Sequence, residues 1–253
     1  MDHRSRRQQL RKYFFSYKLK RPLIMIVAGW LFAKLAWSHG LSGIGNLATI
    51  VALAGLAWIG YQAWLQWDAP SDETVDEWFR NDLTDLIKIA HQKTDLLPQQ
   101  MVREPLVIAS PILWYTHGID NKDLVFKKGK DRSVRFGVYN VTIFVLAEHL
   151  LAAYACDYDF IRKVGLNETT REYHYRDIVS VNTEEYSTNF TLPDGQRLIK
   201  TQAFRLSVAS GEHIRIIIDA HQVRTMTRGD IPSTGAEAAV KVIRSMLREK
   251  KNA

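Results

Sequence analysis

The side chains best suited to binding a ligand are concentrated between residues 127 and 135, where the chain reads KKGKDRSVR. Gly129 and Asp131 favour a turn, so this run is predicted to be the tip of a hairpin. Several cations on one turn can bind a phosphate group or an anionic bilayer surface, where each contributes about 1 kcal/mol. The alternative is a solvated tip without a ligand. The predicted ligand-binding residues are Lys127, Lys128, Lys130, Arg132 and Arg135.

Residue types suited to catalysis are scattered. The eight histidines form no H-E-x-x-H pair, and the chain has no phosphate-binding loop or G-x-S-x-G element. Asp157 and Asp159 follow Cys156, and negative charge raises a thiol pKa, the opposite of what a nucleophile needs. We expect these two acids, and the Glu184/Glu185 pair, to be solvated. The sequence predicts a protein that is not an enzyme and that uses no cofactor or metal.

The positive charge belongs to one short segment. The net charge is +7, and residues 1–21 contain eight of the 34 Lys and Arg residues but one of the 27 acids. The remaining chain is neutral, which argues against a basic nucleic-acid-binding surface. The single cysteine excludes an internal disulfide and a multi-cysteine zinc site.

Two long apolar segments follow this basic tail. Residues 44–67 carry no charge and exceed the roughly 20 residues that a membrane-spanning helix needs. Residues 22–37 also span a bilayer if Lys34 extends to the interface. The spacing of Gly29 with Ala33 and of Ala48 with Ala52 arises by chance or lets two helices approach closely. The predicted interfacial anchors are Trp30, Lys34, Trp37, Trp58, Trp64 and Trp67.

The basic tail predicts the orientation. Positive flanking residues stay cytoplasmic, so two spans place both termini in the cytoplasm and the protein in the inner membrane. Three glycosylation sequons, at Asn140, Asn167 and Asn189, matter only if the C-terminal part faces a lumen. The alternatives are a cleaved signal peptide and a buried soluble helical hairpin, and the length of the second segment disfavours both.

The rest of the chain divides into a helix and a β-rich part. Residues 68–98 are predicted to form an amphipathic linker helix that begins near Ser71 and ends near Leu97-Pro98. Its apolar stripe packs on the following domain, or else lies on the membrane or pairs with another copy. Residues 105–253 form the predicted β domain, which is a bent sheet or partly open barrel. Its expected strands are 106–108, 112–116, 124–127, 134–146, 150–158, 171–175, 179–183, 198–208 and 213–219.

A C-terminal helix completes this α+β architecture. Ser233 or Thr234 caps it, and one apolar face covers an opening of the sheet. The apolar face comprises Ala236, Ala239, Val240, Ile243, Met246 and Leu247, and the polar face Lys241, Arg244, Arg248, Lys250 and Lys251.

An antiparallel β run closed by a C-terminal helix resembles the pleckstrin-homology-like superfold. Residues 172–181, EYHYRDIVSV, are similar to a strand-to-strand segment of bacterial pleckstrin-homology-like and GRAM-like domains, whose aliphatic residues enter the core. Lys130-Asp131-Arg132 is similar to the basic strand-turn-strand with which such domains bind inositol phosphates. The resemblance implies a fold and membrane proximity, and it does not imply an activity.

Three functional hypotheses remain open at this stage. The first is a membrane-anchored, non-enzymatic sensor, scaffold or adaptor whose partners are the bilayer, a protein or second copy, and an anionic ligand. The second is an effector, as in some phage-defence systems, in which an anionic or nucleotide signal makes the spans oligomerise and perturb the bilayer. The third is an enzyme built on Cys156, His149 or His174 in a closed pocket.

Overall fold

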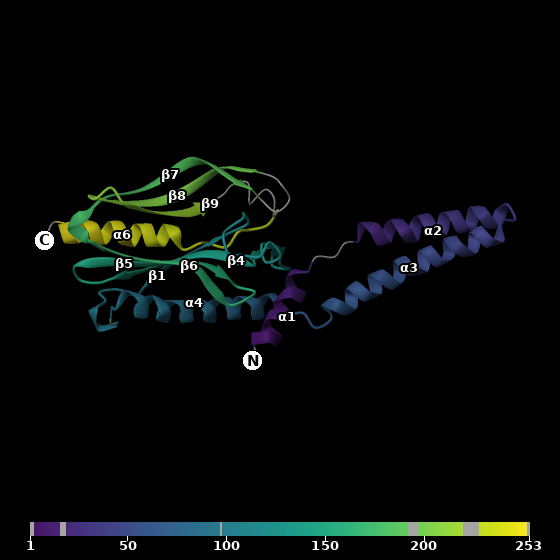
Figure 1. The fold of residues 1–253 in the computed structure, drawn as a ribbon, viewed down its shortest axis with the longest axis horizontal. Coiled ribbons are helices and arrows are strands. Elements are labelled where there is room, and N and C mark those ends of the chain that lie inside the picture. The colour runs from purple at the N-terminus through teal and green to yellow at the C-terminus, as the bar shows by residue number, and fades with distance from the viewer. Residues whose placement is uncertain (1–2, 16–18, 97, 192–196, 220–227, 252–253) are drawn as a thin grey trace. The chain divides into compact units, whose positions relative to one another are not determined.

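The computed structural model describes residues 3–15, 19–96, 98–191, 197–219 and 228–251 (Figure 1). Two features of the sequence lie outside these ranges: Asp194-Gly195, a pair typical of a turn, and His221, one of the eight histidines. The chain divides into two compact units, residues 1–71 and 72–253.

The N-terminal unit is helical. The basic tail forms α1 (His3–Phe14), and the two apolar segments form α2 (Lys20–Ser38) and α3 (Ser42–Gln66). By length and composition, residues 20–38 and 42–64 are able to cross a membrane. Only 22% and 17% of these spans are buried, and their large apolar side chains are exposed, unlike those of a core helix in a soluble protein.

Small residues bring α2 and α3 together. A Cβ atom added to Gly29 would lie 2.7 Å from the Ala48 carbonyl oxygen and 2.9 Å from the Ala52 amide nitrogen. A Cβ atom on Gly55 would lie 2.9 Å from the Pro22 carbonyl oxygen. The close approach suggested by the spacing of Gly29 and the two alanines is therefore confirmed. The six predicted interfacial anchors are all exposed, and the Lys34 ammonium lies 5.7 Å from the centre of the Trp30 ring.

The amphipathic helix α4 (Asp72–Thr94) belongs to the C-terminal unit. It contacts β4, β5 and β6, and its Phe79 ring stacks on Tyr139 with centroids 4.3 Å apart. The Lys163 ammonium lies 3.1 Å from the Asp85 carboxylate, which adds an ion pair between the helix and the turn that joins β5 to β6. The interpretation that the apolar stripe packs on the following domain is confirmed. The helix ends three residues before the predicted boundary.

Nine strands form three antiparallel sheets in the described part of the chain, with orders β1-β4-β5-β6, β2-β3 and β7-β8-β9. A closed barrel is not among them, so the barrel prediction is unconfirmed. Short 3₁₀ helices, η1 (Pro98–Gln100) and η2 (Tyr175–Asp177), precede β1 and β7. The strands are β1 (Leu106–Pro111), β2 (Phe126–Lys128), β3 (Val134–Phe136), β4 (Val138–Leu146), β5 (Leu150–Asp159), β6 (Val164–His174), β7 (Ile178–Thr191), β8 (Arg197–Val208) and β9 (His213–Asp219).

Several strand predictions were wrong in detail. Residues 112–116 form no strand, although Ile112 and Tyr115 donate backbone hydrogen bonds to Val138 and Thr191. The side chains of Ile112, Leu113 and Trp114 pack into an apolar cluster. The single strand predicted over 134–146 is two strands that part at Gly137, where the backbone passes too close to the Asp123 carbonyl oxygen to admit a side chain. The strands β6 and β7 are both longer than predicted.

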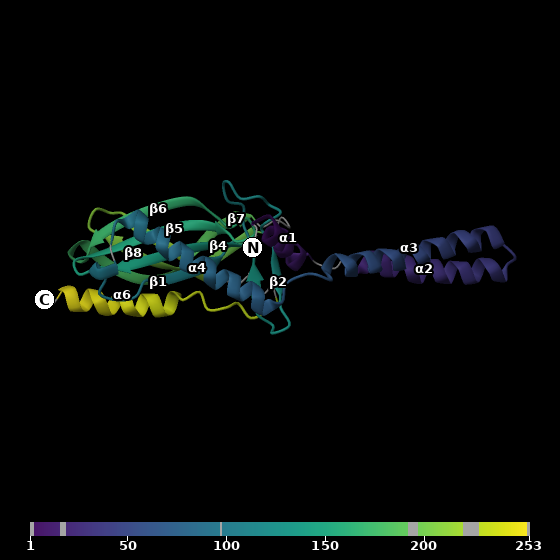
Figure 2. The same ribbon diagram turned by 90° about the horizontal axis from the view of Figure 1, so that it is seen from below.

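The four-stranded sheet lies between α4 and the three-stranded sheet (Figures 1 and 2). The final helix α6 (Ala236–Lys251) contacts both β1 and β7. Gly235, at φ +77°, leads into it, and a Cβ atom there would meet the Val107 carbonyl oxygen. The predicted apolar face of α6 is buried with Phe144, Ile178 and Phe204 in the main core.

Candidate functional site

The predicted basic hairpin is tied to α4 by carboxylates. Arg135 is 5% exposed, and its guanidinium donates to Asp76 at 2.6 and 2.7 Å and to Asp131 at 2.8 Å. The amide of Lys130 donates to Asp72 at 2.8 Å. The Arg135 guanidinium is thus bound by side chains of the protein itself, and three carboxylates offset the charge of the hairpin.

The other cations of the hairpin differ in their surroundings. The Lys128 ammonium donates to the Arg228 carbonyl oxygen at 2.7 Å. Lys127 is half-buried, and burial lowers the pKa of its ammonium group. Lys130 and Arg132 have exposed side chains. Ligand binding by the five predicted cations stays a prediction, and the neighbouring carboxylates weaken its electrostatic basis.

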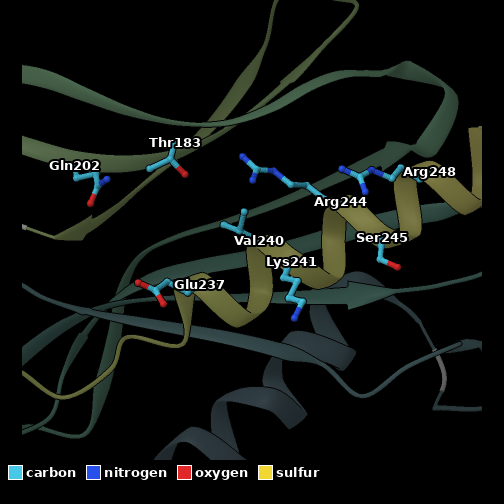
Figure 3. A pocket seen from close by; sticks show the side chains of 8 residues that line it. All are labelled: Thr183, Gln202, Glu237, Val240, Lys241, Arg244, Ser245 and Arg248. Carbon is cyan, nitrogen blue, oxygen red and sulfur yellow. The ribbon is translucent and has the colours of Figure 1, made fainter.

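A second basic site lies along α6 and was not identified from the sequence. It is a cleft of about 700 Å³ between α6 and strands β7 and β8. Figure 3 shows Arg244 and Arg248 extending from α6 toward the side of Thr183, whereas Lys241 and Ser245 point the other way. The lining residues are Thr183, Gln202, Glu237, Val240, Lys241, Arg244, Ser245 and Arg248.

The sequence of α6 explains this placement. Its apolar residues recur at helical spacing and are buried, so the intervening cations must lie on the exposed side. Arg244 and Arg248 are four residues apart and therefore one turn apart on the same side. The polar face was visible in the sequence. The opposing wall was not, because Thr183 and Gln202 reach the cleft through the pairing of β7 with β8.

The cleft has an excess of positive charge. Three cations line it against one acid, Glu237, in the first turn of α6. A guanidinium nitrogen of Arg244 donates to the Val181 carbonyl oxygen at 3.3 Å, which fixes that side chain beside β7. Guanidinium groups bind carboxylate and phosphate through paired hydrogen bonds, so the arrangement suits an anionic ligand.

The predicted chemistry-bearing residues are not assembled into a catalytic arrangement. Cys156 is buried, and burial, with Glu168 and Asp157 as weaker causes, raises the pKa of its thiol to about 12. His149 and His174 are exposed. In the ranges that the structure describes, His, Cys, Asp and Glu side chains form no group of three that could hold a metal.

The expectation that the paired acids are solvated was wrong for Asp159, and Asp157 and Glu184 are partly exposed. Asp159 is completely buried and accepts a hydrogen bond from Arg162 at 2.5 Å. Glu184 accepts from Arg205 at 3.4 Å and from Arg215 at 3.0 Å. Asp157 is held by two asparagine side chains, Asn140 and Asn167. The contacts of Glu184 and Asp157 depend on strand register, which residue spacing alone does not give, whereas the Asp159–Arg162 contact is local.

Comparisons of the chain with protein-family models, curated proteins and solved structures found no match. Any function must therefore be inferred from the geometry of the two units.

Proposed function

We propose that this protein is a membrane-anchored, non-enzymatic binding module, in which α2 and α3 form the anchor and the C-terminal unit binds an anionic ligand or an acidic partner segment. The observation that carries the proposal is the pair Arg244 and Arg248, one turn apart on α6 and extending toward the β7 side of the cleft. Two guanidinium groups at this spacing can engage one phosphate or two carboxylates.

The proposed location is the inner membrane, with both termini in the cytoplasm. The exposed apolar surfaces of α2 and α3 support the anchor. The eight cations in residues 1–21 support a cytoplasmic N-terminus, and an even number of spans returns the C-terminal unit to the same side.

The proposed fold of the C-terminal unit is pleckstrin-homology-like. Supporting features are its antiparallel sheets of four and three strands, followed by one helix. Within the segment 172–181, Ile178 is buried in the main core and Val181 packs against it, as the resemblance implies for aliphatic residues, whereas Val179 is exposed. This likeness concerns the fold and carries no ligand with it.

A binding comparison of three double variants tests the proposed site. The full chain in lipid nanodiscs is titrated with pyrophosphate and, separately, with a short polyglutamate peptide. We expect Arg244→Gln/Arg248→Gln to weaken binding at least about tenfold, because a charge-assisted hydrogen bond contributes about 1.5–3 kcal/mol. Pyrophosphate binding alone indicates a small-molecule ligand, and peptide binding alone indicates a protein segment.

The other two variants are the controls. Lys130→Gln/Arg132→Gln removes two exposed cations of the hairpin, and Lys88→Gln/Arg176→Gln removes the same charge from exposed sites elsewhere. Both should bind like the wild type. Equal binding by all four proteins, or loss only in the hairpin variant, would show that the α6 cleft is not the site.

A further inference from the structure

A row of polar side chains crosses the four-stranded sheet on the face that also builds its core. Ser110 on β1 pairs in register with Asn140 on β4, which pairs with Asp157 on β5. On the same face, Ile108, two residues before Ser110, and Phe144, four residues after Asn140, are fully buried in the main core. A polar row beside an apolar core departs from the pattern that stabilises a sheet, and such departures concentrate at functional sites.

The polar row lines a small pocket. The pocket has a volume of about 180 Å³. Residues from β9 and from the segment that follows β1 complete its wall, so it combines apolar, polar and charged surfaces. The full lining is Ser110, Ile112, Trp114, Thr116, Asn140, Asp157, Arg215 and Ile217.

Ser110 supplies an independent sign that this pocket holds a ligand. It is 1% exposed, and its hydroxyl oxygen has no hydrogen-bond partner in the described part of the chain. A buried hydroxyl without a partner destabilises the folded protein, because it has lost its hydrogen bonds to water and makes no other in their place. A polar group bound in the pocket would restore that hydrogen bond.

Charges of both signs are fixed at the pocket. The Asp157 carboxylate accepts from the side-chain amides of Asn140 at 2.9 Å and Asn167 at 2.8 Å. The pairing of β5 with β6 shifts register at this point, and the extra residue lies on β6 between Leu166 and Thr169, beside Asn167. Arg215 is positioned by Glu184 at 3.0 Å. The pocket thus offers an anion that can pair with an ammonium group and a cation that can attract a carboxylate.

We propose that this pocket binds a free amino acid with a small side chain. The ammonium group lies between Asp157 and the Ser110 hydroxyl, and the carboxylate lies toward Arg215. Ile112, Trp114 and Ile217 form the apolar wall for the side chain. The positive charge of Arg215 disfavours a simple amine, and the volume of the pocket excludes large side chains.

Equilibrium dialysis of the full chain in detergent micelles tests this proposal. The probes are L-alanine, L-serine and L-valine, with ethylamine and propionate as molecules that carry only one of the two charges. We expect saturable binding of at least one amino acid and binding at least about tenfold weaker for ethylamine and propionate. The absence of saturable amino-acid binding would overturn the proposal and leave a water-filled pocket.

Two pocket variants and one control localise the binding. Asp157→Asn and Ser110→Ala should each weaken amino-acid binding at least about tenfold. Ser110→Ala removes one oxygen without changing the backbone, so it decides the question even if Asp157→Asn fails to fold. Asp177→Asn neutralises a half-exposed carboxylate on η2 and should bind like the wild type. Unchanged binding in Ser110→Ala would place the amino acid elsewhere.

Discussion

At the scale of single residues, Arg135 illustrates how one buried cation joins two elements. Its neighbours Asp76 and Asp131 lie on α4 and on the hairpin, and both carboxylates are close to half-exposed. We expect Arg135→Met to lower the free energy of unfolding by about 1–3 kcal/mol, below the range for fully buried pairs because solvent screens the two acids. Urea unfolding of the full chain in detergent measures this, with Arg176→Met as the exposed control. Equal losses of stability in Arg135→Met and Arg176→Met would contradict the claim that Arg135 joins α4 to the hairpin.

The same network predicts a dependence of stability on pH. The hydrogen bond from Arg135 lowers the pKa of Asp131 from 3.8 to about 2. The lowered pKa means that this contribution to folding is present above pH 3.8 and is lost as the pH falls toward 2. Unfolding curves across that window should therefore converge for the wild type and Asp131→Asn as the pH falls. A difference in stability between the two proteins that stays the same at every pH would show that ionised Asp131 does not contribute to folding.

Cys156 provides a third prediction at this scale. Burial raises the pKa of its thiol to about 12, so almost no thiolate forms at neutral pH and the side chain is inaccessible. We expect the folded chain to resist iodoacetamide at neutral pH and the urea-unfolded chain to react fully. Mass spectrometry of the alkylated protein measures both. Rapid labelling of the folded chain would indicate an activated thiol and would revive the enzyme hypothesis.

At the scale of elements, the α2–α3 contact is specified by Gly29. Leucine at this position would force apart backbones whose atoms lie 2.7 and 2.9 Å from the added Cβ position. Overpacking of this kind typically costs about 1–3 kcal/mol, so Gly29→Leu should lower the melting temperature of the detergent-solubilised chain. Gly60→Leu is the matched control, because an added Cβ atom there meets nothing within 4 Å. A similar loss in both variants would mean that helix packing at Gly29 is not the cause.

The sequence predicted those elements whose pattern is local. The length of the apolar segments located α2 and α3, and apolar periodicity located α4 and the buried face of α6, each within a few residues. It misread residues 112–116, because a short apolar run looks alike whether it joins a sheet or packs in a loop. Neither the α6 cleft nor the row Ser110–Asn140–Asp157 was predicted, since each combines distant segments through strand register.

At the scale of the whole molecule, the positive charge and the apolar segments are confined to one unit, which suggests that the two units have different functions. The N-terminal unit carries the net charge and the two candidate spans, and the C-terminal unit carries both proposed binding sites. Protease digestion tests the orientation of these parts. We expect the C-terminal unit to be degraded in inside-out membrane vesicles and protected in intact spheroplasts. Degradation in spheroplasts would reverse the proposed topology.

The most direct test of the central claim is native mass spectrometry of the full chain extracted from the membrane fraction of its host. The account predicts that the wild-type chain is found in that fraction and carries an anionic adduct, which Arg244→Gln/Arg248→Gln loses and Lys88→Gln/Arg176→Gln keeps. A chain recovered only from the soluble fraction would contradict the anchor. An adduct equally abundant in both variants, or a wild-type chain without one, would contradict binding in the α6 cleft.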